Sequence, residues 1–334
     1  MSIANPDSVR IHVVNVDHGD AIIVEFPDYE GEMHLGVVDT GRPETPYKER
    51  LARYLKDLVE LRAMEYQIEF VCITHPHEDH YGGLRSLLDG FSAAGGRTSI
   101  RQFWDSGFRT SAKTYNELLE TVAADERIVF VRLAAGAEFE FGETRVYVMA
   151  PSLDLRNRFD TYGVDRNNAS VVLRLSYKGA TAILAGDAHF DSWGKIAEEF
   201  PRTTKISYFK DAKVERSESL NQLSCQLLKL SHHGSKHGTS LEYLEKLGPE
   251  FFMVTCASPA WYSQYKPGWG ASWPHPLTDL AVSELKSAPD VRLSYRDGNV
   301  VYTLKSGRVK GVDTFTEIPG QQGFLEKLSA AISA

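Results

Sequence analysis

The order of apolar and polar positions along the chain predicts an α/β protein. Apolar runs of strand length alternate with segments in which leucines recur every three or four residues, the spacing of an amphipathic helix. We expect strands at 9–16, 21–26, 34–41, 68–74, 100–107, within 128–150, and at 170–177, 180–187, 226–235, 251–257, 291–296 and 299–307. We expect helices at 46–63, 83–91, 114–126, 192–200, 241–248, 277–288 and 324–334.

The arrangement of these segments predicts how the chain is organised. Strands come first in a row, then strands alternate with helices, and this order occurs a second time. Such a pattern fits two sheets with helices on their outer faces. We expect one domain over 9–318, followed by a tail helix within 319–334. Residues 201–222 are polar and lack periodicity, and we interpret them as a surface insertion.

Composition narrows the class of protein. The chain has 334 residues, of which 42% are hydrophobic, enough for a large core, and it has no 18-residue apolar run that would span a membrane. The N-terminus lacks the basic and apolar regions of a signal peptide. Three cysteines stand far apart without metal-binding spacing, as in a reduced cytoplasmic protein. A net charge of −8 argues against a broad basic surface for long duplex nucleic acid, but leaves room for a small or single-stranded substrate.

The clearest chemical signal is a cluster of histidines directly after the apolar run 68–74. His75, His77, Asp79 and His80 place three imidazoles and a carboxylate within six positions. These are common ligands of zinc and manganese, and no thiolate is present to complete a structural zinc site. We expect His75 and His77 to share one metal ion, and Asp79 and His80 to face a second. The sequence therefore predicts a metal centre at the end of a buried strand.

This cluster and the Gly-Gly pair that follows it resemble the signature of the metallo-β-lactamase superfamily. Further segments resemble the soluble hydrolase domain of ComEC-type competence proteins, in the same order and over about residues 10–305: NVDHGDAIIVEF, VVDTG, FWDSG, NNASVVLRL, AILAGDA, LKLSHHGS and WPHP. The resemblance implies a four-layer αββα sandwich and a two-metal hydrolase. The membrane channel of those proteins is absent from this chain, so we expect a free-standing relative that does not enter the membrane.

The resemblance also assigns roles to individual residues. It implies two divalent metal ions, zinc or manganese, with these ligands: His75 and His77 for the first ion, Asp79, His80 and His233 for the second, and Asp187 between them. His232 would bind substrate or support a ligand, and Asp39 would orient a ligand through a hydrogen bond. Taken without the resemblance, Asp187 would be interpreted as an ordinary turn residue after Gly186.

One segment departs from the superfamily pattern. A third motif usually supplies a histidine to the first metal, but this chain has no histidine between His80 and His189. The matching segment contains Asn167 and Asn168. The amide of either asparagine, or a water, would take the position of the missing histidine at the first metal. Oxygen ligands of this kind favour manganese.

Several other residues are candidates near the centre. His275 would contact a scissile phosphate or donate a proton, the alternative being a loop histidine between prolines. The backbone of Ser235 and the charge of Lys236 would hold an anionic substrate, unless this stretch is simply a solvated loop. We interpret His18 and His189, which flank motifs, as structural.

Three functions remain open from the sequence. The first is phosphodiester hydrolysis of nucleic acid or a nucleotide, with Asp79, Asp187 and His275 as catalytic residues. The second is hydrolysis of a lactone, thioester or β-lactam. The third is a non-catalytic metal-binding interaction module. A serine nucleophile is not favoured because the chain has no GxSxG elbow, and the sequence names no protein partner.

Overall fold

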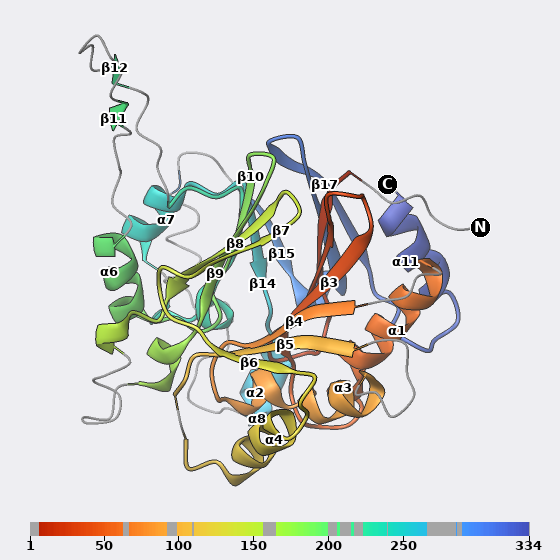
Figure 1. Ribbon diagram of the computed structural model, residues 1–334. Helices are drawn as coiled ribbons and strands as arrows, with labels where there is room; N and C mark the ends of the chain where they lie inside the picture. The colour runs from red at the N-terminus through yellow and green to blue at the C-terminus, as the bar shows by residue number, and fades with distance from the viewer. Residues whose placement is uncertain are drawn as a thin grey trace.

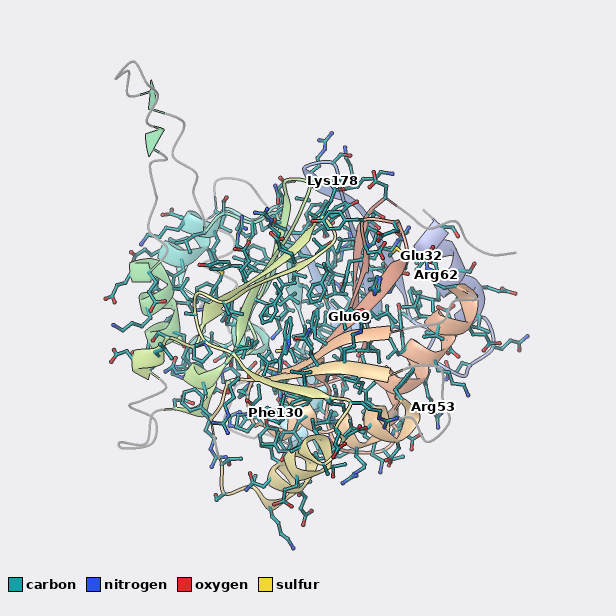
Figure 2. All side chains as sticks on the ribbon, in the orientation of Figure 1. Glu32, Arg53, Arg62, Glu69, Phe130 and Lys178 are labelled. Atoms are coloured by element: carbon teal, nitrogen blue, oxygen red, sulfur yellow. The ribbon has the colours of Figure 1, made fainter. Side chains whose placement is uncertain are left out.

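The protein is described from a computed structural model, for residues 7–62, 67–91, 99–108, 110–155, 165–199, 206–207, 215–216, 223–238, 240–265, 285 and 289–333. Two mixed β-sheets face one another, and helices cover the outer face of each (Figure 1). The side chains of the two sheets fill the space between them (Figure 2). This is the four-layer α/β sandwich that the sequence predicts.

The first sheet has eight strands among the described residues. In spatial order they are β17 (Arg308–Phe315), β16 (Asn299–Lys305), β1 (Val9–Val13), β2 (Ala21–Pro27), β3 (Met33–Thr40), β4 (Gln67–Ile73), β5 (Ser99–Asp105) and β6 (Val129–Arg132). Neighbours from β17 to β3 are antiparallel, whereas those from β3 to β6 are parallel. The change from antiparallel to parallel pairing follows from the segments that connect the strands. Parallel neighbours need a crossover, such as a helix, between them.

The second sheet has seven strands among the described residues. Their order is β15 (Asp290–Leu293), β14 (Phe251–Val254), β13 (Leu227–Lys229), β10 (Ala180–Leu184), β9 (Val172–Tyr177), β8 (Thr144–Ala150) and β7 (Glu138–Phe141). The strands from β15 to β10 are parallel and those from β10 to β7 antiparallel.

The helices are amphipathic and bury one face each against a sheet. Those on the first sheet are α1 (Arg50–Arg62), α3 (Leu84–Phe91), α4 (Lys113–Ala123) and α11 (Phe324–Ser333), and those on the second are α6 (Phe190–Glu199), α7 (Leu241–Leu247) and α8 (Pro259–Tyr265). Short helical turns are η1 (Tyr47–Glu49), α2 (Glu78–Tyr81), η2 (Arg166–Ala169), η3 (Ser231–Gly234) and α10 (Ser294–Asp297). On α1, Leu51, Leu55 and Leu58 are fully buried, as their spacing predicts.

Some predicted elements differ from the structure. The strand expected over 226–235 is wrong beyond Lys229, because η3 turns the chain there. The strand expected over 291–296 ends at Leu293, where α10 begins. The C-terminal helix α11 is present, and Phe324 and Leu328 are fully buried in the core beneath it, so it packs as part of the first layer.

Other expectations fall partly or wholly on residues outside the description. Within the predicted insertion 201–222, β11 (Ile206–Ser207) pairs with β12 (Glu215–Arg216). The helix expected at 277–288 lies almost entirely outside the described residues. Across the part of the chain that is described, we find no helix with the length and apolar character needed to span a bilayer.

The topology places several chain segments at one edge of the sandwich. β3 and β4 are parallel, so their carboxyl ends lie at the same edge of the first sheet. β10 and β13 are parallel in the second sheet, and their carboxyl ends likewise lie together. The residues that follow these four strands meet between the two sheets, and they carry the histidines and aspartates identified in the sequence.

Candidate metal centre

The short helix α2 presents the histidine cluster at the end of β4. Its position depends on two glycines that let it approach the end of β3 closely. A Cβ on Gly82 would lie 2.2 Å from the backbone nitrogen of Pro43, and one on Gly83 would lie 2.2 Å from Thr40 O. Side chains at either position would push α2 away from β3. The Gly-Gly pair is therefore needed to seat the ligand loop.

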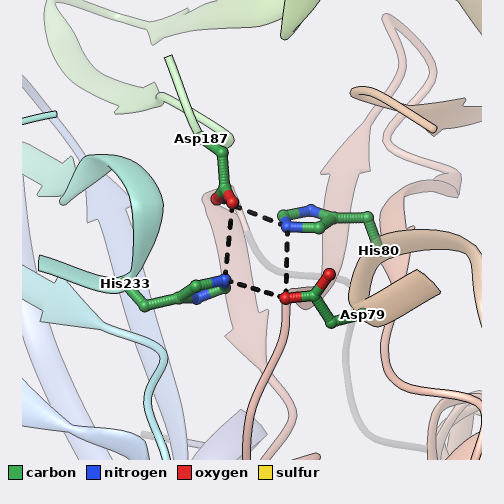
Figure 3. Close-up of side chains that lie close together, drawn as sticks. All are labelled: Asp79, His80, Asp187 and His233. Atoms are coloured by element: carbon green, nitrogen blue, oxygen red, sulfur yellow. Dashed lines mark hydrogen bonds and ion pairs between the residues drawn. The ribbon is translucent and has the colours of Figure 1, made fainter. Parts of the chain in front are cut away.

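Four of the predicted ligands converge on one point (Figure 3). His80 Nε2 lies 3.3 Å from Asp187 Oδ1 and 4.0 Å from Asp79 Oδ2. His233 Nε2 lies 3.2 Å from Asp79 Oδ2 and 3.6 Å from Asp187 Oδ2. Two imidazoles and two carboxylates thus enclose a small space, although they come from the ends of β4, β10 and β13.

A second group of donors adjoins the first. His75 Nε2 lies 2.9 Å from His77 Nδ1 and 3.7 Å from Asp187 Oδ2. One ligand atom from each of these three residues lies within 4.8 Å of the others. Asp187 belongs to both groups, so its carboxylate lies between them.

The chemistry of these residues fits divalent metal ions. His80 Nε2 and Asp187 Oδ1 are buried and face each other, yet neither has a hydrogen-bond partner among the residues that the structure describes. Buried polar atoms are rarely left in this state, because it costs about 1–3 kcal/mol each. Burial lowers the pKa of His75 to well below its usual value and also lowers that of His77, which keeps both imidazoles neutral and able to bind a cation.

Asp39 holds the ring of His80 through a short contact. Its Oδ2 lies 2.7 Å from His80 Nδ1, which directs Nε2 of the same ring into the centre. The backbone and hydroxyl of Thr74 donate to the two oxygens of Asp39 at 2.8 and 2.7 Å. Burial alone would lower the pKa of His80, but the carboxylates of Asp187 and Asp39 outweigh it and raise that pKa well above its usual value.

His232 and His233 are held in an unusual backbone conformation. Their φ angles are 48° and 54°, and that of Gly234 is 81°. Residues other than glycine seldom adopt this left-handed region, and clusters of such residues are typical of functional sites. The turn presents His233 to the first group of donors, with its Nδ1 held 2.7 Å from Thr255 O. It presents His232 beside the second, with Nε2 3.8 Å from Asp187 Oδ2.

A chain of polar side chains supports His232 on the side away from Asp187. His232 Nδ1 lies 2.7 Å from His189 Nε2, and His189 Nδ1 lies 2.9 Å from Asp165 Oδ2. The amide of Asn167 lies 3.1 Å from the same His189 nitrogen. Asn168 points elsewhere: its amide donates to Asp191 at the start of α6 and stays outside the centre. His189 is in none of the donor groups of the centre among the described residues, and its contact with His232 fits the supporting, structural role expected from the sequence.

Two further residues near the centre have no counterpart in the sequence prediction. Asp20 is buried against the ammonium of Lys229 and the hydroxyl of Thr255, and its Oδ1 lies 3.5 Å from His233 Nδ1. Lys229 Nζ also donates to Gly186 O at 3.0 Å and lies 3.9 Å from Asp187 Oδ1. The buried ion pair between Asp20 and Lys229 thus connects the loop after β1 to the ends of β10 and β13, which carry the ligands. The sequence signal for Asp20 is the Gly-Asp-Ala turn within the segment that resembles ComEC-type proteins, and not a local spacing.

His18 contacts Asp79 at the edge of the centre, in a supporting position. Its Nε2 lies 3.2 Å from Asp79 Oδ2, and its Nδ1 lies 2.8 Å from Tyr262 OH. The ring stacks on Trp261 with centroids 5.1 Å apart. His18 therefore supports the exposed side of Asp79 and lies next to solvent.

The predicted anion-binding loop is arranged differently. The backbone N–H of Ser235 donates to His232 O at 2.8 Å, and the N–H of His237 points at the Ser235 hydroxyl at 3.3 Å. These amides stabilise the turn and do not face a ligand, so the expectation for the backbone of Ser235 is wrong. Lys236 is exposed. His275, the predicted proton donor, lies outside the described residues.

A cavity of about 620 Å³ opens beside Asp79 and His18. It is bounded by the loops that follow β1, β3 and β4 and by the start of α8, and its lining includes Arg42, Glu44 and Trp261. The side chain of Asp79 is 23% exposed, compared with 2% for Asp187. Substrate therefore has access to the centre from the side of Asp79.

Comparisons with known proteins identify the family of the chain. The family described as the metallo-beta-lactamase superfamily matches residues 15–224. ComE operon protein 3 of Bacillus subtilis (strain 168) is 20% identical over 256 residues, which cover 74% of this chain and 28% of that protein. The chain thus spans little more than a quarter of the length of this curated relative.

Two solved structures are similar in fold. The CmlA beta-hydroxylase E377D mutant matches with a TM-score of 0.50 and 14% identity over 90% of this chain and 54% of the other, and CmlA comes from Streptomyces venezuelae. The metallo-beta-lactamase fold protein YhfI from Bacillus subtilis matches with a TM-score of 0.49 and 12% identity over 89% of this chain and 99% of the other.

Proposed function

The chain belongs to the metallo-beta-lactamase superfamily, and we propose that it is a two-metal hydrolase that cleaves phosphodiester bonds in nucleic acid or nucleotides. The observation that carries this proposal is the position of Asp187, which lies within reach of both groups of donors. A shared carboxylate is the usual means of holding two cations about 3.5–4 Å apart.

The ligand sets follow from the two groups. His75, His77 and Asp187 would hold one cation, with His232 completing the set in place of the missing third-motif histidine. The other would be held by Asp79, His80, His233 and Asp187. When bound, such a pair of cations lowers the pKa of an attacking water toward about 7 and offsets the charge that develops on the attacked phosphate.

The protein side chains would position the reactants. Asp79 faces the cavity and is oriented by His18 and His233, so it is placed to direct the attacking water at the phosphorus. Lys229 lies behind Asp187 and offsets part of the negative charge gathered there. His18 is 14% exposed and contacts Asp79 through Nε2 and Tyr262 OH through Nδ1, so it would hold Asp79 in position. The role of protonating the leaving oxygen stays with His275, as the sequence proposes.

The choice of a phosphodiester rests on the ComEC-type resemblance, which extends over most of the chain. The donor set alone would also suit hydrolysis of a lactone, thioester or β-lactam. For this reason the substrate panel must include both classes.

The test measures metal content and hydrolysis in the same preparation. We expect the purified protein to bind about two divalent ions per chain and to cleave bis(p-nitrophenyl) phosphate, and then to act on a panel of single-stranded DNA, RNA and cyclic nucleotides. Asp187→Ala should lose at least one ion and lower kcat/KM on the order of 10²–10³-fold or more. The surface variant Asp125→Asn should match the wild type. A protein that binds both ions but cleaves only lactones, thioesters or β-lactams, or none of the compounds, would refute the proposal.

A further inference from the structure

His232 turns its Nε2 atom toward the metal centre. This nitrogen lies 3.8 Å from Asp187 Oδ2, close to the 3.7 Å between that oxygen and His75 Nε2. The backbone N–H of His232 donates to Gly186 O at 3.1 Å, which holds the main chain of His232 beside Asp187. A histidine binds a cation only through a nitrogen that carries no proton. His232 can therefore be a ligand through Nε2 only while the proton of its ring is on Nδ1.

Asp165 and His189 decide which nitrogen of His232 carries the proton. Asp165 Oδ2 lies 2.9 Å from His189 Nδ1, and because a carboxylate can only accept, the proton of the His189 ring is on Nδ1. His189 Nε2 then has a lone pair, and it lies 2.7 Å from His232 Nδ1, which donates to it. The lone pair of His232 is thereby left on Nε2, the atom that faces Asp187.

The side chain of Asn167 favours the same arrangement of protons. Its Nδ2 lies 3.1 Å from His189 Nε2, the nitrogen that also faces His232 Nδ1. An amide N–H₂ group can only donate, so two donors converge on this nitrogen, which must accept. Asn167 is buried in η2, and Asp165 begins the same turn by accepting from the Asn167 backbone N–H at 3.0 Å. The turn η2 thus supplies both residues that hold His189.

We propose that Asp165 and His189 are positioning residues of the metal centre, which hold His232 in the tautomer whose Nε2 completes the ligand set of the first cation. The first cation is the one that His75, His77 and Asp187 would hold. The proposal rests on the ligand sets of the proposed function and deepens them. It explains how a chain without the third-motif histidine keeps another imidazole ready for this cation.

The arrangement also couples the support to the shared carboxylate. His189 follows Asp187 by two positions, so the loop after β10 carries both side chains. Ligand histidines are commonly supported directly by a carboxylate or a backbone carbonyl. Here a second imidazole stands between the carboxylate of Asp165 and the ligand His232.

The test measures zinc affinity by competition with a chelator, without any substrate. His189→Leu removes the acceptor for His232 Nδ1 and lets the ring proton move to Nε2. We expect the affinity for one of the two ions to fall about 10–100-fold, the usual effect of losing such a support, and the affinity for the other ion to stay unchanged. His77→Ala, which removes a ligand of the first cation, identifies which ion is affected. His34→Leu, near the start of β3 and away from the centre, should bind both ions as the wild type does.

Two further variants separate positioning from packing. His189→Gln keeps a side-chain oxygen that can accept from His232 Nδ1, and we expect it to retain most of the affinity that His189→Leu loses. Asp165→Ala leaves His189 free to carry its proton on either nitrogen, and we expect a smaller loss. Because Asp165 is 49% exposed, this variant carries the test if His189→Leu does not fold. Equal losses in the Gln and Leu variants would show that His189 only fills space.

A double variant tests whether His189 acts through His232. In His232→Ala the ligand itself is gone, so the addition of His189→Leu should cause no further loss of zinc affinity. A further loss as large as that of His189→Leu alone would overturn the proposal. Unchanged zinc affinity in both His189→Leu and Asp165→Ala would overturn it as well.

Failure of this inference can be told apart from failure of the proposed function. Zinc affinity reports on the ligands, whereas cleavage of bis(p-nitrophenyl) phosphate reports on hydrolysis. If the wild type cleaves this compound and His189→Leu binds zinc normally, the positioning role is refuted while the hydrolase stands. If zinc affinity depends on His189 through His232 but no phosphodiester is cleaved, the positioning role stands and the phosphodiesterase is refuted.

Discussion

His80 Nε2 lies 3.3 Å from Asp187 Oδ1, although His80 follows β4 of the first sheet and Asp187 follows β10 of the second. Within the described part of the chain, neither atom has a hydrogen-bond partner. The interface between the sheets therefore ends in a pair of buried ligand atoms that a cation would satisfy. Residues that keep these two side chains in position should control metal affinity without touching the metal.

Asp39 is the first such residue. It accepts from Thr74 at both oxygens and lies 2.7 Å from His80 Nδ1. Asp39→Asn would turn an amide N–H₂ toward one of these donors and weaken the orientation of His80. We expect metal affinity to fall about 10–100-fold, the usual effect of losing such a supporting carboxylate. Competition with a chelator measures it, with Asp313→Asn as the control. An unchanged dissociation constant would contradict the role of Asp39.

Substitution of Gly19 tests how closely the loop after β1 must approach the ligand loop at 75–80. Its φ is +122°, and a Cβ there would lie 2.3 Å from Asp79 O. Gly31 also has a positive φ, +85°, but a Cβ there would meet no atom within 4 Å. Gly31→Ala should cost only the conformational strain, about 1–2 kcal/mol, with metal affinity unchanged. Gly19→Ala should cost more and also weaken metal binding, because Asp79 must move.

The comparison of the two glycine variants isolates the steric effect from the backbone effect. Urea unfolding gives the stability of each variant, and metal titration gives its affinity. If both variants lose the same stability and keep wild-type metal binding, the contact between Gly19 and Asp79 does not position the ligand.

The sequence predicts the local part of the site and misses the part made by long-range packing. His75, His77, Asp79 and His80 could be identified because they are close together after an apolar strand. Asp187 and His233 required the resemblance to a family, since each stands alone in its own segment. Asp39 was likewise assigned from the resemblance, and the structure shows the hydrogen bond that it makes.

Asp20 and His18 were missed for a physical reason. Both lie in the loop after β1, and they reach the centre because that loop folds over α2, with Asp20 N–H donating to Asp79 O at 3.2 Å. No local spacing encodes this contact. The prediction that the strand at 226 continues to 235 was wrong for a similar reason. The left-handed backbone of His232 and His233 is rare for histidine, and it depends on the surrounding structure.

Lys229 should stabilise the fold through Asp20. Its side chain is buried in contact with the Asp20 carboxylate, and it also donates to Gly186 O. Lys229→Met would leave the buried charge of Asp20 unpaired, and we expect a loss of about 3–5 kcal/mol in the free energy of unfolding. The double variant Asp20→Asn/Lys229→Met removes both charges and should recover part of this loss.

The two single variants and the double variant form a cycle measured by urea unfolding at saturating metal. A coupling energy between the two positions is expected because they are in direct contact. Additive effects of the two substitutions would show that the pair does not act as a unit.

Glu25 should give the protein a defined response to acid. It is buried between the guanidinium of Arg62, at 2.6 Å and 2.9 Å, and the ring of His12, on the side of the first sheet that α1 covers. Figure 2 labels Arg62 where α1 ends. Burial alone would raise the pKa of Glu25, but His12 and Arg62 together lower it from 4.5 to about 2.

Because the folded pKa lies below the unfolded one, the ionised carboxylate stabilises the fold above about pH 4.5, and this contribution is lost as pH falls toward 2. The shift from 4.5 to about 2 corresponds to about 3 kcal/mol. Glu25→Gln should therefore be about 3 kcal/mol less stable than the wild type at pH 7, and the difference should narrow between pH 4.5 and pH 2. Urea unfolding at pH 7, 3.5 and 2.5 measures the difference, with the exposed variant Glu242→Gln as control. A stability difference that stays constant down to pH 2.5 would show that Glu25 is not held ionised by Arg62 and His12.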